Sequence, residues 1–197
     1  MFPERPRDER GETSLAELLT AVVVTAIAMV AMYTMMTAQN QVFSAQDRVV
    51  EMQQTARTAM AMISRELRMA GYNPVQGVSF NGITYDPVQL RIRADLNGNG
   101  VTTQINEDIT YSYDAANLRI LRTTTGSVIT FPNIQAFAFA YLDSNGNPTT
   151  TSADIREVSV TITTRAARPD STYPANNGYR TFTLRSRVTA RGLGLSS

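Results

Sequence analysis

The sequence contains no lysine, histidine, cysteine or tryptophan, and all 18 of its basic residues are arginine. These absences exclude lysine Schiff bases and the serine or cysteine nucleophiles that depend on histidine. They also exclude disulfides and metal sites built from thiolate or imidazole ligands. The missing cysteines do not identify the compartment, because an oxidising space permits disulfides without requiring them.

The sequence also lacks an excess of either positive or negative charge. The 197 residues include 17 acidic side chains against the 18 arginines, and the net charge of +1 indicates no polyanionic partner. A series of arginines along and after the last predicted strand is typical of a solvated sheet face or a protected strand edge: Arg180, Arg185, Arg187 and Arg191. DNA or another surface ligand is therefore a partner that the sequence does not require.

The carboxylates of the C-terminal part, such as Asp154 and Glu157, have no spacing that pairs a general acid with a base. We therefore predict that the protein is not an enzyme, that no residue is catalytic and that no cofactor is required.

A long uncharged stretch is present near the N-terminus. Residues 18–46 contain no Asp, Glu or Arg, and the apolar part, residues 18–36, is broken only by three threonines and a tyrosine. As a helix this part spans roughly 28 Å, about the thickness of a bilayer core. A buried core helix is the alternative, but few domains of this size could surround it. The stretch therefore predicts a single membrane span.

The helix is expected to continue well beyond the apolar stretch, because neither glycine nor proline occurs between Gly11 and Gly71. From residue 17 to residue 70 it would be about 81 Å long. Residues 12–46 form its apolar half, and residues 47–70 carry one apolar stripe at gaps of three and four: Val49, Met52, Ala56, Met60, Ile63, Leu67 and Ala70. We expect Gly71 to cap the helix in the left-handed conformation.

After Gly71 the apolar period changes from 3.6 residues to two, as in Val88, Leu90 and Ile92. Further strands are predicted over residues 109–113, 118–123, 127–131, 134–142, 158–163 and 182–188. Short connections rich in Asn, Asp, Gly and Pro favour an antiparallel sheet. The fold class is therefore α+β: a long N-terminal helix whose stripe packs on an antiparallel β-sheet head, residues 71–197.

This order of parts resembles the type IV pilin-like proteins. The residues that carry the resemblance are Gly11 and the run SLAELL at residues 14–19, which looks like a class III signal, with residues 1–11 as the leader peptide. The segment ISRELRMAGY at residues 63–72 is similar to the PilW-type minor pilins. The resemblance implies the pilin fold and a minor subunit that takes part in pilus assembly or in priming at the filament tip.

The resemblance also implies processing. A prepilin peptidase would cut between Gly11 and Glu12, and the new amino terminus would be N-methylated. Glu17 would then pair with the amino group of a neighbouring subunit. It would be sixth in the mature chain, whereas the family places this glutamate fifth; a cut after Glu12 restores that count but loses the glycine that the peptidase requires. A carboxylate beside the helix N-terminus, where the dipole favours it, is the alternative.

The implied partners are other pilin subunits, the prepilin peptidase and the inner membrane. The protein would cross the inner membrane once before assembly and then enter an extracellular filament of a Gram-negative bacterium. Two alternatives stay open: a pseudopilin of type II secretion, which uses the same kind of helix, and an uncleaved single-span anchor for a binding or enzymatic domain.

One loop suggests a metal. The segment DLNGNG at residues 95–100 fits the start of an EF-hand loop, with oxygen side chains at alternate positions and glycine sixth. The candidate calcium ligands are Asp95, Asn97, Asn99, Glu107 and Asp108. The twelfth position holds Asn106 instead of the usual glutamate, and no helices flank the loop. A simple Asn- and Gly-rich turn, like the one that begins at Asp143, is the alternative.

Overall fold

The computed structural model describes residues 15–170 and 173–194, so the predicted leader peptide and the predicted cleavage site at Gly11 and Glu12 lie outside the described residues. The chain forms two compact units, Met1–Ala45 and Gln46–Ser197. Helix α1, Leu15–Met69, has 55 residues and contributes to both units. The predicted α+β class, with one long N-terminal helix and antiparallel sheets, is confirmed.

In the second unit, α1 is buried along one stripe. The buried helix residues are Met52, Ala56, Ala59, Met60, Ile63, Ser64 and Leu67, and Ala70 follows directly after the helix. These include most of the predicted stripe. Val49 differs, because it is only half-buried. The period of three and four residues therefore identified the packed face of the helix correctly.

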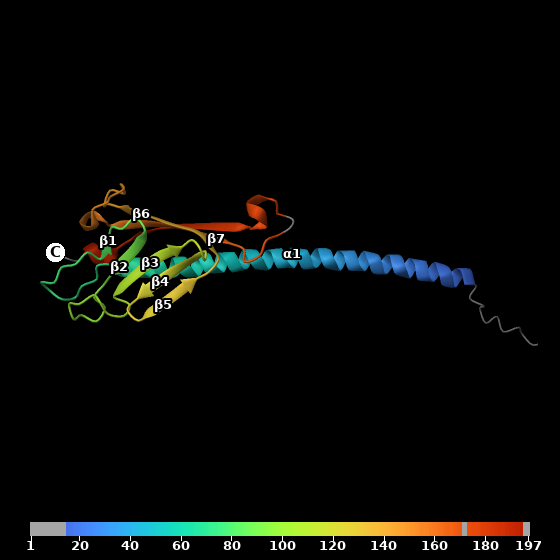
Figure 1. Ribbon diagram of the computed structural model, residues 1–197, viewed down its shortest axis with the longest axis horizontal. Helices are drawn as coiled ribbons and strands as arrows, with labels where there is room; N and C mark the ends of the chain where they lie inside the picture. Colours follow the sequence, from blue (N-terminus) through green and yellow to red (C-terminus); the bar gives the residue numbers. More distant parts are fainter. Residues whose placement is uncertain (1–14, 171–172, 195–197) are drawn as a thin grey trace, which may run out of the picture. The chain divides into compact units, whose positions relative to one another are not determined.

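The strands form two antiparallel sheets, whereas the sequence analysis expected one. The first contains β1 to β5 in sequence order: Ile83–Thr84, Gln89–Arg93, Asp108–Asp114, Arg119–Thr124 and Ser127–Phe131. The second contains β6, β7 and β8: Ile134–Leu142, Glu157–Arg165 and Thr181–Thr189. Figure 1 shows the two sheets on either side of the second half of α1. A helix with a wide apolar stripe can pack against two sheets. The hydrophobic core therefore contains residues of the helix and of both sheets.

The predicted strands coincide with observed ones, and β5 and β6 have the predicted bounds. Two details differ. The two-residue strand β1 was not predicted, because so short a segment has no period of its own. Val88 lies outside β2 and is 76% exposed, because Asp86 accepts hydrogen bonds from the backbone N–H groups of Val88 and Gln89 and so holds a turn there.

Tyrosine hydroxyl groups tie the two sheets together. Tyr141 of β6 donates to the backbone carbonyls of Asp86 and Gln89, at 3.0 and 3.2 Å. Tyr113 of β3 donates to the carbonyl of Gln135 at 2.6 Å, where the register of β6 and β7 is broken by a bulge. A bulge leaves backbone groups without a ladder partner, and the Tyr113 hydroxyl satisfies one of them.

The C-terminal end of α1 is a close-packed glycine junction. Gly71 has φ of +79°, as predicted for the cap, and its N–H donates to the carbonyl of Arg93. A Cβ on Gly82 would lie 2.1 Å from the Gly71 nitrogen, and one on Gly192 would lie 2.4 Å from the Ala70 carbonyl oxygen. Two chain segments, at Gly82 and Gly192, therefore approach the helix end more closely than any side chain allows.

A charged cluster fixes α1 against the first sheet. Glu66 of α1 accepts a hydrogen bond from Arg122 Nε of β4 at 2.9 Å and another from the Tyr111 hydroxyl of β3 at 2.5 Å. The side chain of Arg122 is 5% exposed and that of Glu66 14%. Arg122 also donates to the Asn106 side chain, so its guanidinium is well supplied with acceptors. Pairing of this quality is what permits charges to be buried.

We expect Glu66→Ala to destabilise the protein by about 3–5 kcal/mol, because it leaves the Arg122 guanidinium buried without its counter-ion. The measurement is urea unfolding of the full chain in detergent, followed by far-UV circular dichroism. The matched control is Glu51→Ala, which removes an exposed carboxylate from the same helix and should change stability by less than about 0.5 kcal/mol. Equal effects of the two substitutions would contradict this account.

Stability should also fall in alkali. Burial raises the pKa of Tyr111 and of Tyr141 above the ordinary tyrosine value, so both stay protonated in the folded protein after the unfolded chain has lost its protons. The stabilisation is complete below about pH 10 and is lost above it, at about 1.4 kcal/mol per pH unit for each tyrosine. Denaturation midpoints between pH 8 and 11.5 measure this slope. Tyr141→Phe should lower the slope by about 1.4 kcal/mol per pH unit, and an unchanged slope would contradict the prediction.

Candidate functional site

The first unit exposes an unusually large apolar surface. Of the described residues 15–43, all are exposed except the half-buried Thr37. The exposed large apolar side chains are Leu15, Leu18, Leu19, Val22, Val23, Val24, Ile27, Met29, Val30, Met32, Tyr33, Met35, Met36, Val42 and Phe43. A contiguous apolar surface of this extent marks a site of contact with lipid or with another protein.

By length and composition, α1 is able to cross a membrane. Its most apolar 18-residue window has a mean hydropathy of 2.3 and is 0% buried, whereas the core helix of a soluble protein would be mostly buried. A signal sequence near the N-terminus passes the same test of length and composition. The observation is thus an apolar helix segment that the described residues leave exposed.

The threonines of this segment do not oppose its apolar character. Thr20, Thr25 and Thr34 each donate the side-chain hydroxyl to a backbone carbonyl three or four residues earlier, at 2.7 to 2.9 Å. Their hydroxyl hydrogen bonds are thereby made inside the helix.

Glu17 lies in the first turn of α1 and is exposed. An acidic side chain in this position is favoured by the helix dipole. Its backbone carbonyl also accepts the hydroxyl hydrogen bond of Thr20. The structure therefore places Glu17 at the start of the apolar segment, and the pairing predicted for its carboxylate stays a prediction.

The second candidate site is the loop between β2 and β3. Asp95 is fully buried and organises the turn through three backbone N–H groups. Its Oδ1 accepts from Gly98 at 2.8 Å and from Asn99 at 3.2 Å, and its Oδ2 accepts from Gly100 at 2.8 Å. Gly98 and Gly100 both have φ of +75°, a conformation that favours glycine.

Glu107 closes the same loop from its other end. It is 2% exposed, and its Oε1 accepts hydrogen bonds from the N–H groups of Leu96 and Asn97 at 3.0 and 3.2 Å. Its Oε2 is buried and has no hydrogen-bond partner among the described residues. Asn97 and Asn99 each accept one backbone N–H through the side-chain oxygen, so both amide oxygens lie within the loop.

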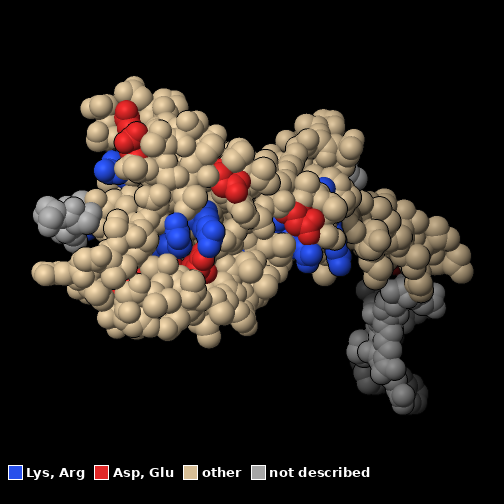
Figure 2. Space-filling model, turned by 60° about the vertical axis from the view of Figure 1, so that its left-hand side comes forward, with Lys and Arg blue, Asp and Glu red and all other residues tan. Residues whose placement is uncertain are grey.

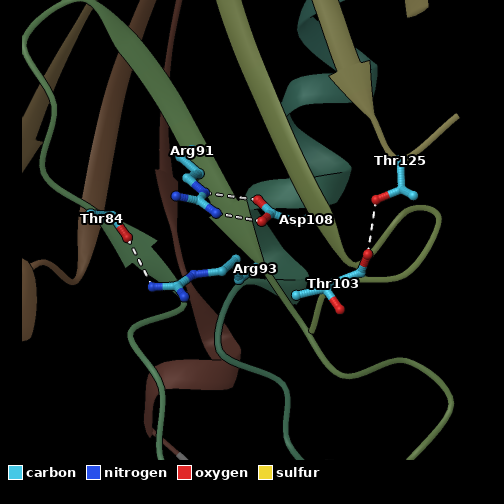
Figure 3. A network of polar contacts seen from close by, with 6 residues as sticks. All are labelled: Thr84, Arg91, Arg93, Thr103, Asp108 and Thr125. Carbon is cyan, nitrogen blue, oxygen red and sulfur yellow. Dashed lines mark hydrogen bonds and ion pairs between the residues drawn. The ribbon is translucent and has the colours of Figure 1, made fainter. Parts of the chain in front are cut away.

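Asp108 is separated from the other candidate ligands. Its carboxylate forms a two-point ion pair with Arg91 of β2, at 2.9 Å to Nε and 2.5 Å to Nη2 (Figure 3). Glu107 lies in the turn that precedes β3, whereas Asp108 is the first residue of that strand and pairs with β2. Within the described residues no group of three or more His, Cys, Asp or Glu side chains is arranged to hold a metal.

The arginines of β8 lie among partners of their own. Arg185 donates to the Ser159 hydroxyl, and Arg187 lies 3.9 Å from a Glu157 oxygen. On the face shown in Figure 2, basic and acidic side chains lie beside one another in small groups. Such mixed charge does not make the one-sign surface that nucleic-acid binding uses.

No protein-family model and no curated protein sequence matches the chain. Among solved structures, a type IV-like pilin from Thermus thermophilus is similar to it, at 15% sequence identity and a TM-score of 0.41. The similarity covers 74% of this chain and 97% of the Thermus chain. At this distance no residue role is transferred.

Two structural features, the positions of the Glu66 and Glu107 side chains, were not predicted from the sequence. The sequence contains one indication that Glu66 forms an ion pair in the core. This glutamate falls between Ile63 and Leu67 of the apolar stripe, where a charged side chain requires a partner. No local sequence pattern indicates that the Glu107 side chain points into the loop. Its direction depends on the backbone conformation of Asn106, whose φ is +65°.

Proposed function

We propose that this protein is a type IV pilin-like filament subunit, and within that class a minor pilin of the PilW type that acts in assembly or priming at the tip. One observation carries the proposal: a single helix has an apolar, exposed segment in its first half and a second half packed on antiparallel sheets. Lipid would cover the exposed half before assembly, and the helices of other subunits would cover it in the filament.

The length of the uncharged segment favours a filament over a simple anchor. Residues 18–46 extend roughly 43 Å as a helix, whereas a bilayer core of about 30 Å needs only about 20 residues. Val42 and Phe43, beyond the most apolar part, are still 57% and 62% exposed. Packing between subunit helices gives these residues a partner, and a membrane anchor alone does not require them.

The processing steps follow from the resemblance of residues 11–19 to a class III signal. A prepilin peptidase would remove residues 1–11 and leave Glu12 as an N-methylated first residue. Glu17 would then neutralise the amino terminus of a neighbouring subunit. In an apolar helix bundle an unpaired carboxylate is costly, so this pairing would also fix the axial register of one subunit on the next.

The mature N-terminus is the first prediction to test. We expect intact and peptide mass spectrometry of the native membrane protein to show a chain that starts at Glu12 with one added methyl group. A start at Thr13 would move the cut and make Glu17 fifth. A chain that keeps its leader would contradict the proposal and favour the uncleaved membrane anchor.

Removal of the Glu17 carboxylate should separate membrane insertion from assembly. We expect Glu17→Ala to enter the membrane normally, because the apolar segment is intact, and to fall about tenfold or more in sheared filaments, a loss of at least about 1.4 kcal/mol per contact. Glu51→Ala, which removes an exposed carboxylate later in the same helix, is the control and should assemble normally.

The same fractionation distinguishes the alternatives. A processed wild-type protein that never appears with sheared filaments would favour a pseudopilin of type II secretion. Equal recovery of Glu17→Ala and wild type would contradict the pairing assigned to Glu17.

A further inference from the structure

Two carboxylates in the β2–β3 loop are buried without a basic partner. Asp95 is 0% exposed and Glu107 is 2% exposed. The ion pairs of the described residues involve other carboxylates, namely Glu66, Asp108, Asp114, Glu157 and Asp170. Buried charges in proteins are normally paired with an opposite charge or coordinate a metal ion.

Backbone N–H groups donate to both oxygens of Asp95 but to only one oxygen of Glu107. Five such groups donate to Asp95 and Glu107, yet Glu107 Oε2 is buried and accepts nothing. An unpaired buried oxygen that carries negative charge is a strong acceptor for a cation. Asn97 Oδ1 and Asn99 Oδ1 each accept one hydrogen bond, and an amide oxygen has a second lone pair for a ligand.

The structure explains why the expected glutamate stands one position late. Asn106, at the twelfth position, has a left-handed backbone with φ of +65°. Its side-chain oxygen accepts from Arg122 at 2.9 Å, and its N–H donates to Thr124 at 2.8 Å, so it belongs to the sheet. The next residue, Glu107, is therefore the one whose carboxylate meets the loop.

The loop is also reachable from solvent. Asn97 and Glu107 line a surface hollow of about 520 Å³ together with Leu96, Thr103 and Gln104. Asn97 and Asn99 are exposed, so an ion in solvent can reach the loop at their side chains.

We propose that this loop binds one calcium ion through Glu107, Asp95 and the side-chain oxygens of Asn97 and Asn99, with water completing the shell. The donors are all oxygen, which suits a hard cation. Calcium accepts six to eight oxygen ligands in flexible geometry, whereas magnesium demands a near-ideal octahedron. Asp108 is left out of this ligand set because it is paired with Arg91 (Figure 3).

The effect of the ion would be to order residues 95–107 and the ends of β2 and β3. With two carboxylates the affinity should be modest, with a Kd of about 10⁻⁴–10⁻³ M, as in extracellular calcium modules. The calcium proposal is independent of the proposed filament role, so a result that contradicts one of them does not contradict the other.

The experiment is calorimetric titration and thermal unfolding of the full chain in detergent, after treatment with a chelator, with CaCl₂ and with MgCl₂. We expect saturable binding of one calcium ion and a rise in Tm of about 3 °C at ten times the Kd. Magnesium at the same concentration should produce a smaller rise.

Two variants separate a calcium ligand from a structural carboxylate. Glu107→Gln keeps the side-chain shape and one acceptor oxygen but removes the charge, so it should lose calcium binding at least tenfold while remaining as stable as wild type, or more so, in chelator. Asp108→Asn weakens the Arg91 pair and should lower Tm with and without calcium, but keep the calcium-dependent rise. No calcium binding by the wild-type chain, or equal binding by Glu107→Gln, would overturn the proposal.

Discussion

The structure depends on one constraint: helix α1, Leu15–Met69, contains no glycine or proline, and its apolar surface must be covered in two different ways. In the second unit, the stripe from Met52 to Leu67 is covered by both sheets of the same chain. In the first unit, the large apolar side chains of the described residues are exposed. Apolar surface of that extent is stable only against lipid or against other protein, and this requirement links the fold to the proposed role in a filament.

Apolar packing alone does not fix how the helix and the two sheets fit together, because hydrophobic contact is not directional. Directional contacts supply the missing specificity. The Glu66 carboxylate joins α1 to β3 and β4 through Tyr111 and Arg122, and the Thr164 hydroxyl of β7 donates to the Met52 carbonyl of α1. Tyr141 joins β6 to the start of β2. Each of these contacts is buried or nearly so, and a shift of one residue along the helix would leave its polar groups without partners.

The loop between β2 and β3 follows a different principle, because backbone groups dominate it. Five N–H groups converge on Asp95 and Glu107, and this arrangement shapes the turn whether or not a metal is bound. What an Asn- and Gly-rich turn does not explain is a second buried carboxylate with an unsatisfied oxygen. The comparable turn at Asp143 accepts its hydrogen bonds with a carboxylate that is only half-buried, and the pKa of this carboxylate is lowered chiefly by the N–H of Asn147. That contrast separates a simple turn from a candidate ion site.

Local sequence determined the parts of this protein that depend on neighbouring residues: the uninterrupted helix, its apolar stripe, the left-handed cap at Gly71 and strands such as β5 and β6, because period, breakers and turn residues act over a few positions. Only the tertiary structure decided what depends on distant residues. The division into two sheets, the pairing of Glu66 with Arg122 and the glycine junction of Gly71, Gly82 and Gly192 join segments far apart in the chain. The direction of Glu107 likewise depends on Asn106 being held by Arg122 and Thr124 of the next strand. No periodic pattern encodes such contacts, since they arise only when the chain has packed.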